Sequence, residues 1–250
     1  MSQPRSSGYF RTSYAGDIVL VDTRAQWAGL ALLAAGLAGL PFAASPFQLD
    51  LANQVLLASI GAVALMLLTG YAGQISLGHA GLLAAGAFVT GILFKETNAP
   101  FWVTLPASAL VGAMLGMVFG LPSLRLRGLY LAVSTLALHF IVIYAGGEYE
   151  TRRGYSTGVV IDPPRIGDWV LADARTWYFV LLAAAAATVL FSLNLLRSRT
   201  GRAWRAIHGR EAVAEAMGIS VHRAKLSAFV VSSTITSIAG CLFAYYRGFV

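Results

Sequence analysis

The 250-residue chain is poor in cysteine and in charge. Its single cysteine, Cys241, excludes an internal disulfide and a metal cluster built on cysteine ligands. Charged residues make up only 12% of the chain, against about 25% in an ordinary soluble domain, which disfavours a soluble fold. The chain also lacks a G-x-x-x-x-G-K-[ST] segment, so it has no phosphate-binding loop of the kind with which many ATPases hold nucleotide.

Apolar residues are abundant in the chain. They make up 57% of it, and many of them lie in long runs. Several runs reach the ~20 residues that a helix needs to cross a bilayer, and they are too long and unbroken for the strands of a barrel. The sequence therefore predicts an all-α, multi-pass helical integral membrane protein. We expect about seven spans, near residues 27–44, 51–69, 77–94, 101–121, 129–145, 177–196 and 226–246.

The first run has a second interpretation. It ends in small residues, as a cleaved signal peptide does, but a long polar tail precedes it and further apolar runs follow. We expect residues 1–25 to be a cytoplasmic tail and residues 26–250 to form the transmembrane domain.

Charge patterning predicts the orientation of the helices. The net charge of +7 comes from basic residues beside apolar runs, a pattern that favours anionic lipid and membrane topology over nucleic acid. Segment 197–225 holds seven Lys or Arg against Glu211 and Glu215, whereas segment 146–176 is near charge balance. The positive-inside rule places the N-terminus and segment 197–225 in the cytoplasm, and segment 146–176 on the outer side.

Glycines recur along two of the runs. Small residues let helices approach closely in lipid, so we expect these glycines to mark helix contacts. They are Gly112, Gly116 and Gly120 on the fourth run, and Gly81, Gly86 and Gly91 on the third.

Segment 197–225 has the pattern of a short amphipathic helix. Thr200 suits its N-cap, and Gly218 suits a left-handed C-terminal cap. Two interpretations remain open: a helix lying on anionic lipid, or a helix that docks its apolar side in a groove of a partner protein. The apolar side is expected to consist of Trp204, Ile207, Ala214 and Met217.

Segment 70–81 interrupts two apolar runs with four glycines and the polar residues Gln74, Ser76 and His79. Broken helices at membrane depth persist only where protein or a water-filled cavity covers the freed backbone groups. These polar residues therefore either join neighbouring helices by hydrogen bonds, lie in a cytoplasmic turn, or line a translocation path.

Ser134 and Thr135 are further candidates for such a path, although their hydroxyls are expected to bond back to their own helix. Ser134 and His139 raise the alternative of an intramembrane serine hydrolase. A spacing of five residues puts them on different helix faces, however, and a serine nucleophile needs a base within hydrogen-bond reach.

Three runs resemble one protein family. GRAWRAIHGREAVAEAMGISVHRAKLSAFVVSS resembles the cytoplasmic loop of the branched-chain amino acid ABC permeases, and the LivM type more closely than the LivH type. GYAGQISLGHAGLLAAGAF and LRLRGLYLAVSTLAL are similar to two further signature runs of that family, in the expected order. The resemblance covers most of residues 50–246.

The resemblance implies a permease subunit of an ATP-driven importer of branched-chain or similar small amino acids in the bacterial inner membrane. It implies a second, LivH-like permease, two cytoplasmic ATP-binding subunits that hold ATP and Mg²⁺, and a periplasmic substrate-binding protein facing segment 146–176. This chain would bind no cofactor or metal and have no catalytic residue. Its coupling residues would be Gly201, Arg202, Glu211, Ala212, Glu215, Ala216 and Gly218.

Other functions remain open. Members of the family continue for several spans beyond the run that ends this chain, so we expect C-terminal spans to be missing. The alternatives are a permease for another small polar solute, such as urea, an amide or a sugar, and a fragment that does not transport.

Overall fold

The computed structural model describes residues 24–250 except 127, 156–157, 167–168 and 172. Residues 1–23 of the expected cytoplasmic tail therefore lie outside the described residues. The chain divides into two units, residues 1–50 and 51–250, which are described separately.

The first unit contains α2 (Arg24–Ala43) and the beginning of α3 (Pro46–Met66). Large apolar side chains of α2, such as Trp27, Leu32 and Leu33, are exposed. A helix of this length that is apolar on its outside is suited to lipid.

Seven helices among the described residues are long and apolar enough to cross a membrane. They confirm the predicted all-α, multi-pass fold and the expected number of spans. Besides α2 and α3 they are α4 (His79–Thr97), α5 (Phe101–Gly120), α6 (Leu129–Arg153), α7 (Ala174–Arg197) and α10 (Val221–Arg247).

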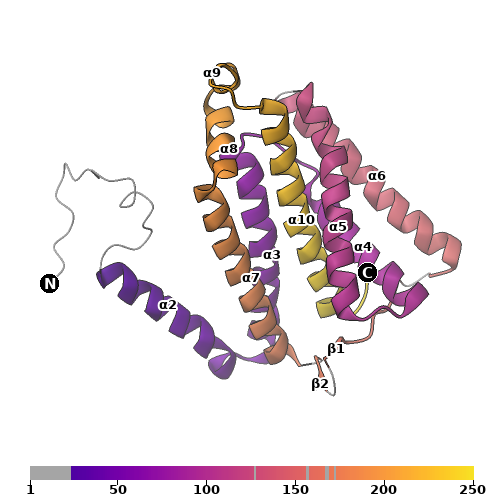
Figure 1. Ribbon diagram of the computed structural model, residues 1–250. Helices are drawn as coiled ribbons and strands as arrows, with labels where there is room; N and C mark the ends of the chain where they lie inside the picture. The colour runs from indigo at the N-terminus through magenta and orange to yellow at the C-terminus, as the bar shows by residue number, and fades with distance from the viewer. Residues whose placement is uncertain (1–23, 127, 156–157, 167–168, 172) are drawn as a thin grey trace. The chain divides into compact units, whose positions relative to one another are not determined.

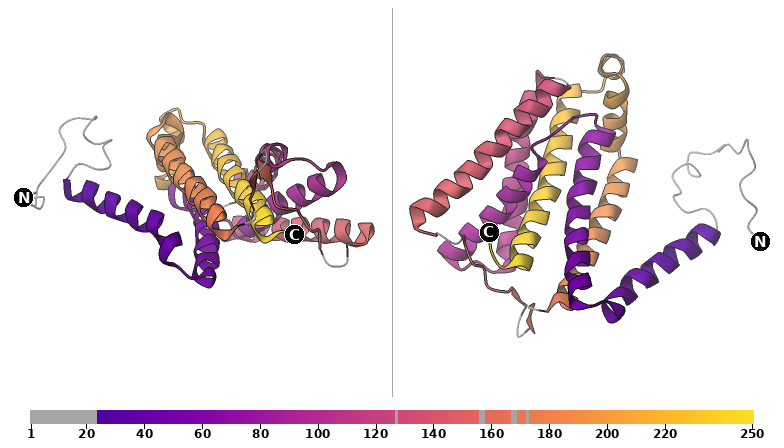
Figure 2. Two further views of the ribbon diagram at one scale, coloured as in Figure 1. Left: turned by 90° about the horizontal axis from the view of Figure 1, so that it is seen from below. Right: turned by 180° about the vertical axis from the view of Figure 1, so that it is seen from behind.

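Helix α10 occupies the centre of the second unit. It packs against α4 and α5, and α4 also packs against α5 and α6. Figures 1 and 2 show α10 running between α5 and α7. Of the seven helices α10 is the most buried. The helices that pack against it therefore fix the position of its first turns.

Five of the six glycines confirm the predicted helix contacts, and the prediction was wrong for Gly91, where an added Cβ would meet Val159 and Val250, outside the helices, at 3.5–3.6 Å. A Cβ added to Gly116 would lie 2.9 Å from Ser233 of α10, and one added to Gly112 would collide with Ser237. On α4, a Cβ at Gly86 would collide with the backbone carbonyl of Ser237. Glycine is therefore needed at these positions because α4 and α5 approach α10 more closely than a side chain permits.

Buried hydroxyls join the same three helices. The Thr90 hydroxyl donates to the carbonyl of Gly86 at 2.8 Å and lies 3.0 Å from the Ser108 hydroxyl. The Ser237 hydroxyl of α10 donates to the carbonyl of Ser108 on α5 at 2.8 Å. These bonds satisfy polar groups that would otherwise be buried without partners, and the sequence pattern did not single them out.

A tight turn separates α4 from α5. Asn98 adopts a left-handed conformation (φ 48°), and its N–H donates to the carbonyl of Phe94 at 2.9 Å. Pro100 then cannot continue a helix and stands at the N-cap of α5 with extended backbone. This turn falls in the gap between the expected spans 77–94 and 101–121.

The predicted outer segment, 146–176, is shorter than expected. Residues 146–153 belong to α6, and α7 begins at Ala174. Helix α6 is capped by Gly154, whose backbone is left-handed (φ 75°) and whose N–H donates to the carbonyls of Glu150 and Thr151. A glycine ends a helix in this way because it lacks a Cβ, and that signal lay beyond the apolar run on which the prediction rested.

Two very short strands, β1 (Arg165–Ile166) and β2 (Trp169–Val170), form an antiparallel pair within this segment. Nearby, Val159 and Val250 exchange two backbone hydrogen bonds of 2.9 and 3.1 Å. The residues after α10 are thus tied to the connection between α6 and α7, at the end of the bundle opposite α9 (Figure 1).

Gly240→Ala is expected to destabilise the bundle by about 1–3 kcal/mol, since the new Cβ would collide with the Leu83 carbonyl of α4. Gly61→Ala on α3 is the matched control, because nothing lies within 4 Å of that position, and alanine is the better helix former. Thermal unfolding in detergent measures both variants. Equal transition temperatures for the two would contradict the close packing.

Candidate functional site

The connection between α7 and α10 contains two helices where the sequence pattern predicted one. They are α8 (Arg199–Gly209) and α9 (Glu211–Ala216). Arg210 separates them with extended backbone (φ −153°, ψ 109°). Figure 1 shows both helices at the end of the bundle where α10 begins.

Helix α8 begins at Ser198, whose hydroxyl accepts a hydrogen bond of 3.4 Å from the N–H of Gly201. The prediction that Thr200 is the cap was wrong, because Thr200 lies within the first turn of α8. Gly201 is buried, and a Cβ there would collide with the backbone of Leu196. This expected coupling residue therefore sets the close approach of α8 to α7.

Basic side chains of α8 cap the C-terminal end of α7 by hydrogen bonds to its last carbonyls. Arg202 donates to the carbonyl of Arg197 at 2.8 Å, and Arg205 donates to the carbonyl of Leu196 at 2.8 Å. Cationic donors are favourable at the C-terminal carbonyls of a helix. Arg202, which was expected to belong to the coupling segment, thus joins α8 to the end of α7.

The predicted apolar side of the connection packs inside the chain. Trp204, Ile207 and Ala214 are almost fully buried, and the Trp204 indole donates to the Ser227 hydroxyl of α10 at 3.0 Å. Both interpretations of this side, lipid contact and docking in a partner, are wrong for these three residues. Met217 differs, since it is 77% exposed.

One small surface on and after α9 remains exposed, and we term it the α9 surface. Two of its side chains are large and apolar, Val213 and Met217. Neighbouring exposed apolar side chains are a feature that partner-binding surfaces carry. The α9 surface consists of Ala212, Val213, Glu215, Ala216, Met217 and Gly218.

Gly218 ends α9, as predicted. Its backbone is left-handed (φ 84°), and its N–H donates to the carbonyl of Glu215 at 2.9 Å. The next N–H, of Ile219, donates to the carbonyl of Ala214 at 3.0 Å. This arrangement is a glycine cap that turns the chain toward α10.

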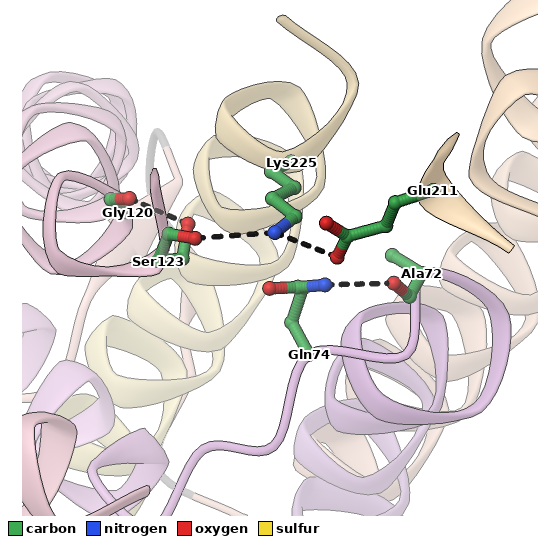
Figure 3. A network of polar contacts seen from close by, with 6 residues as sticks. All are labelled: Ala72, Gln74, Gly120, Ser123, Glu211 and Lys225. Atoms are coloured by element: carbon green, nitrogen blue, oxygen red, sulfur yellow. Dashed lines mark hydrogen bonds and ion pairs between the residues drawn. The ribbon is translucent and has the colours of Figure 1, made fainter. Parts of the chain in front are cut away.

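Glu211 does not face outward with the α9 surface. Its carboxylate lies 2.7 Å from the ammonium of Lys225 on α10, and the two side chains are 22% and 4% exposed. Lys225 also donates to the carbonyl of Ser123, which follows α5, at 3.3 Å (Figure 3). In the sequence Lys225 is the last residue of a basic segment, and its place just before an apolar run was the signal that could have predicted its burial.

A polar pocket of about 530 Å³ adjoins this ion pair. The segment after α3, including Gln74, forms one wall, and α8, α9 and the start of α10 form the others. Glu215 and His222 line it as well. The pocket therefore lies between the segment after α3 and the connection formed by α8 and α9, with Lys225 in its wall.

The helix break expected at segment 70–81 is present. A π-helical turn, Leu67–Tyr71, follows α3, and residues 72–78 are non-helical before α4 begins at His79. Gln74, Ser76 and His79 are all buried. Gln74 donates to the carbonyl of Ala72 at 3.1 Å.

Hydrogen bonds join segment 70–81, which we term the broken segment, to the neighbouring helices. The His79 Nε2 atom lies 3.0 Å from the Ser232 hydroxyl of α10, which donates to the carbonyl of Ala64 at 2.9 Å. The N–H of Leu77 donates to the Thr135 hydroxyl of α6 at 3.0 Å. His79 Nδ1 and the Ser76 hydroxyl are buried without a hydrogen-bond partner.

The structure separates Thr135 from Ser134. Thr135 is buried and its hydroxyl bonds back to Ala132 at 2.8 Å, as expected, while it also receives the bond from the broken segment. Ser134 is half-buried. A difference of five residues places His139 about 140° from Ser134 around the helix, so α6 gives the serine no base on its own face.

Comparison with known proteins identifies the relatives of this architecture. Residues 47–250 match the family model described as "Branched-chain amino acid transport system / permease component". The chain is 34% identical over 234 residues to the high-affinity branched-chain amino acid permease protein LivM of Salmonella typhimurium, and 32% identical to that of Escherichia coli. Both alignments cover 84% of this chain and 55% of the relative, so the chain spans about half the length of these relatives.

A more distant relative is the L-arabinose transport system permease protein AraH of Escherichia coli. It is 28% identical over 175 residues, which cover 69% of this chain and 51% of that protein. No solved structure matches the chain.

Gly218→Ala is expected to destabilise the protein by about 1 kcal/mol, because an L side chain is strained at φ 84° even though nothing lies within 4 Å. Gly209→Ala is the control: it also has open space around it, but its φ is not positive. Denaturation of the purified protein in detergent measures the difference. A Gly218→Ala protein as stable as the control would argue against a strained cap.

Proposed function

Because the chain belongs to the branched-chain amino acid transport permease family, we propose that it is a LivM-like subunit of an ATP-driven importer in the bacterial inner membrane. Its substrate is a branched-chain or similar small amino acid. Membership of this family makes the chain part of a transporter and not an enzyme. The similarity to LivM over most of the chain supports the choice of substrate.

The proposed importer contains four further subunits. A second, LivH-like permease completes the membrane part, two cytoplasmic subunits bind ATP and Mg²⁺ and hydrolyse the nucleotide, and a periplasmic protein delivers the amino acid. This chain itself contacts lipid, binds no nucleic acid and needs no cofactor. The family of importers to which it belongs supports these partners.

The α9 surface is the proposed contact with an ATP-binding subunit. The supporting observation is that Val213 and Met217 are exposed beside Glu215 at one end of the bundle. In this orientation the N-terminus and the end with α8 and α9 face the cytoplasm, in agreement with the seven basic residues of segment 197–225. The strands β1 and β2 then face the periplasm.

Transmission from this contact follows from the packing. Closure of the ATP-binding subunits displaces α9, and the neighbouring helix α8 is joined to α10 by Trp204 and to α7 by Arg202. A displacement at α9 therefore reaches two spanning helices. Such rigid-body motion of packed helices is a common basis for switching between two states.

The broken segment is the proposed part of the translocation path. Its residues are Gln74, Ser76 and His79, with Ser134 and Thr135 on the facing helix. Buried polar atoms without partners, such as His79 Nδ1, support this proposal, because polar groups at membrane depth are expensive and are usually functional.

A sugar is the second candidate for the substrate. The similarity to an arabinose permease favours it over urea or an amide. Uptake of labelled leucine and of labelled arabinose by membranes containing the assembled importer distinguishes the two.

Purification of the tagged chain from its host is expected to recover a P-loop ATPase and a second permease. Glu215→Lys reverses a charge in the middle of the α9 surface, and repulsion at a contact of this kind is expected to reduce the recovered ATPase about tenfold or more. Mass spectrometry of the purified complex measures the recovery.

Glu148→Lys is the matched control, since it makes the same charge change on α6, outside the α9 surface. It should leave the recovery of the ATPase unchanged. Recovery of neither partner with the unaltered, membrane-inserted chain would overturn the proposal.

A further inference from the structure

Lys225 is an unusual residue at its position. It lies in the second turn of α10 and is only 3% exposed. Lysine is almost never buried to this extent unless its charge is paired. Its burial therefore depends on the groups that surround it.

Those groups come from three other segments. Glu211 at the start of α9 supplies the opposite charge at 2.7 Å, and the carbonyl of Ser123 after α5 accepts a hydrogen bond at 3.3 Å. Figure 3 shows the Gln74 side chain, from the segment after α3, beside the same ammonium group. Lys225 thus joins α10 to α9 and to the residues after α5, and it lies beside the broken segment.

Helix α9 is short and buries only one of its residues. It is six residues long, and its joints on either side, Arg210 and Gly218, are non-helical. Its buried residue is Ala214, whose single methyl group offers little contact area. The position of α9 relative to α10 therefore depends strongly on the pair between Glu211 and Lys225.

A buried ion pair resists separation. If α9 moved away from α10, Lys225 would be left as an uncompensated charge in a buried site, which is strongly unfavourable. Moving α9 and α10 together keeps the pair intact and avoids this cost. The pair thus favours one common displacement over a hinge at Arg210 and Gly218.

We propose that Lys225 is a positioning residue that makes α9 and α10 move as one body, so that a push on the α9 surface reaches the centre of the bundle. Helix α10 packs on α4 and α5, and the displacement therefore extends to both. This inference rests on the proposed function and adds to it the residue through which the ATP-binding subunits act on the spanning helices.

The test compares transport with ATP hydrolysis in liposomes that contain the whole importer, purified with the partners of this chain. Lys225→Met removes the charge and keeps an apolar side chain of similar length, and Glu211→Gln removes the opposite charge at a partly exposed site. Both variants are expected to keep the ATPase bound and hydrolysing, while substrate transported per ATP falls about tenfold. Arg223→Met is the control: it removes an exposed positive charge from the first turn of α10 and leaves the ratio unchanged.

The double variant tests whether the two residues act as a pair. Since each single change already breaks the same interaction, Lys225→Met with Glu211→Gln should transport no less per ATP than either single variant. Multiplied losses would mean independent roles and would overturn the inference. A normal transport ratio in both single variants would overturn it as well.

Failure of the two proposals can be told apart. If the unaltered chain recovers its ATPase and couples normally, and the single variants do the same, only the role of Lys225 is lost. If Lys225→Met fails to assemble, Glu211→Gln decides the outcome, and failure of both to assemble would make the pair a folding element and reject the inference. If the unaltered chain binds no ATPase, the proposed function itself fails.

Discussion

Contact between the backbones of α4 and α10 positions the rest of the described bundle. Gly86 lies against the carbonyl of Ser237, and Gly240 lies against that of Leu83, so neither helix carries a side chain where they meet. Lipid offers no hydrophobic force between helices, and close contact of this kind is what holds them together. Hydroxyls of Thr90 and Ser237 add hydrogen bonds from these two helices to Ser108 of α5. The place of the first turns of α10 follows from this packing.

The first turns of α10 contact α8 and α9, on which the proposed coupling depends. Trp204 and Ile207 are buried against the bundle, so the apolar side of α8 is used to attach the connection and is not available to a partner. The proposed contact with a partner is therefore the short α9 surface. The ion pair between Glu211 and Lys225 then joins α9, which carries that surface, to α10. The connection between α7 and α10 thus has an anchored part, α8, and an exposed part, the α9 surface.

The sequence predicted much of this fold because its signals were local. Apolar runs located all seven helices, and Gly218 located the end of α9, since both depend on a residue and its near neighbours. Thr200 failed as a cap because Ser198, two residues earlier, competes for the same role. The length of α6 was also missed, because polar residues beyond the apolar run remain helical up to Gly154.

By itself the sequence determined the class of protein, the number of spans and some of the positions where helices come close, because hydrophobicity and glycine spacing are local signals. Only the tertiary structure decided what each polar side chain does. Burial and pairing arise between residues far apart in the chain, as for Lys225 with Glu211 and for His79 with Ser232. A periodic pattern shows that a helix has an apolar side, but the neighbours that cover this side are set by the packing of the whole bundle.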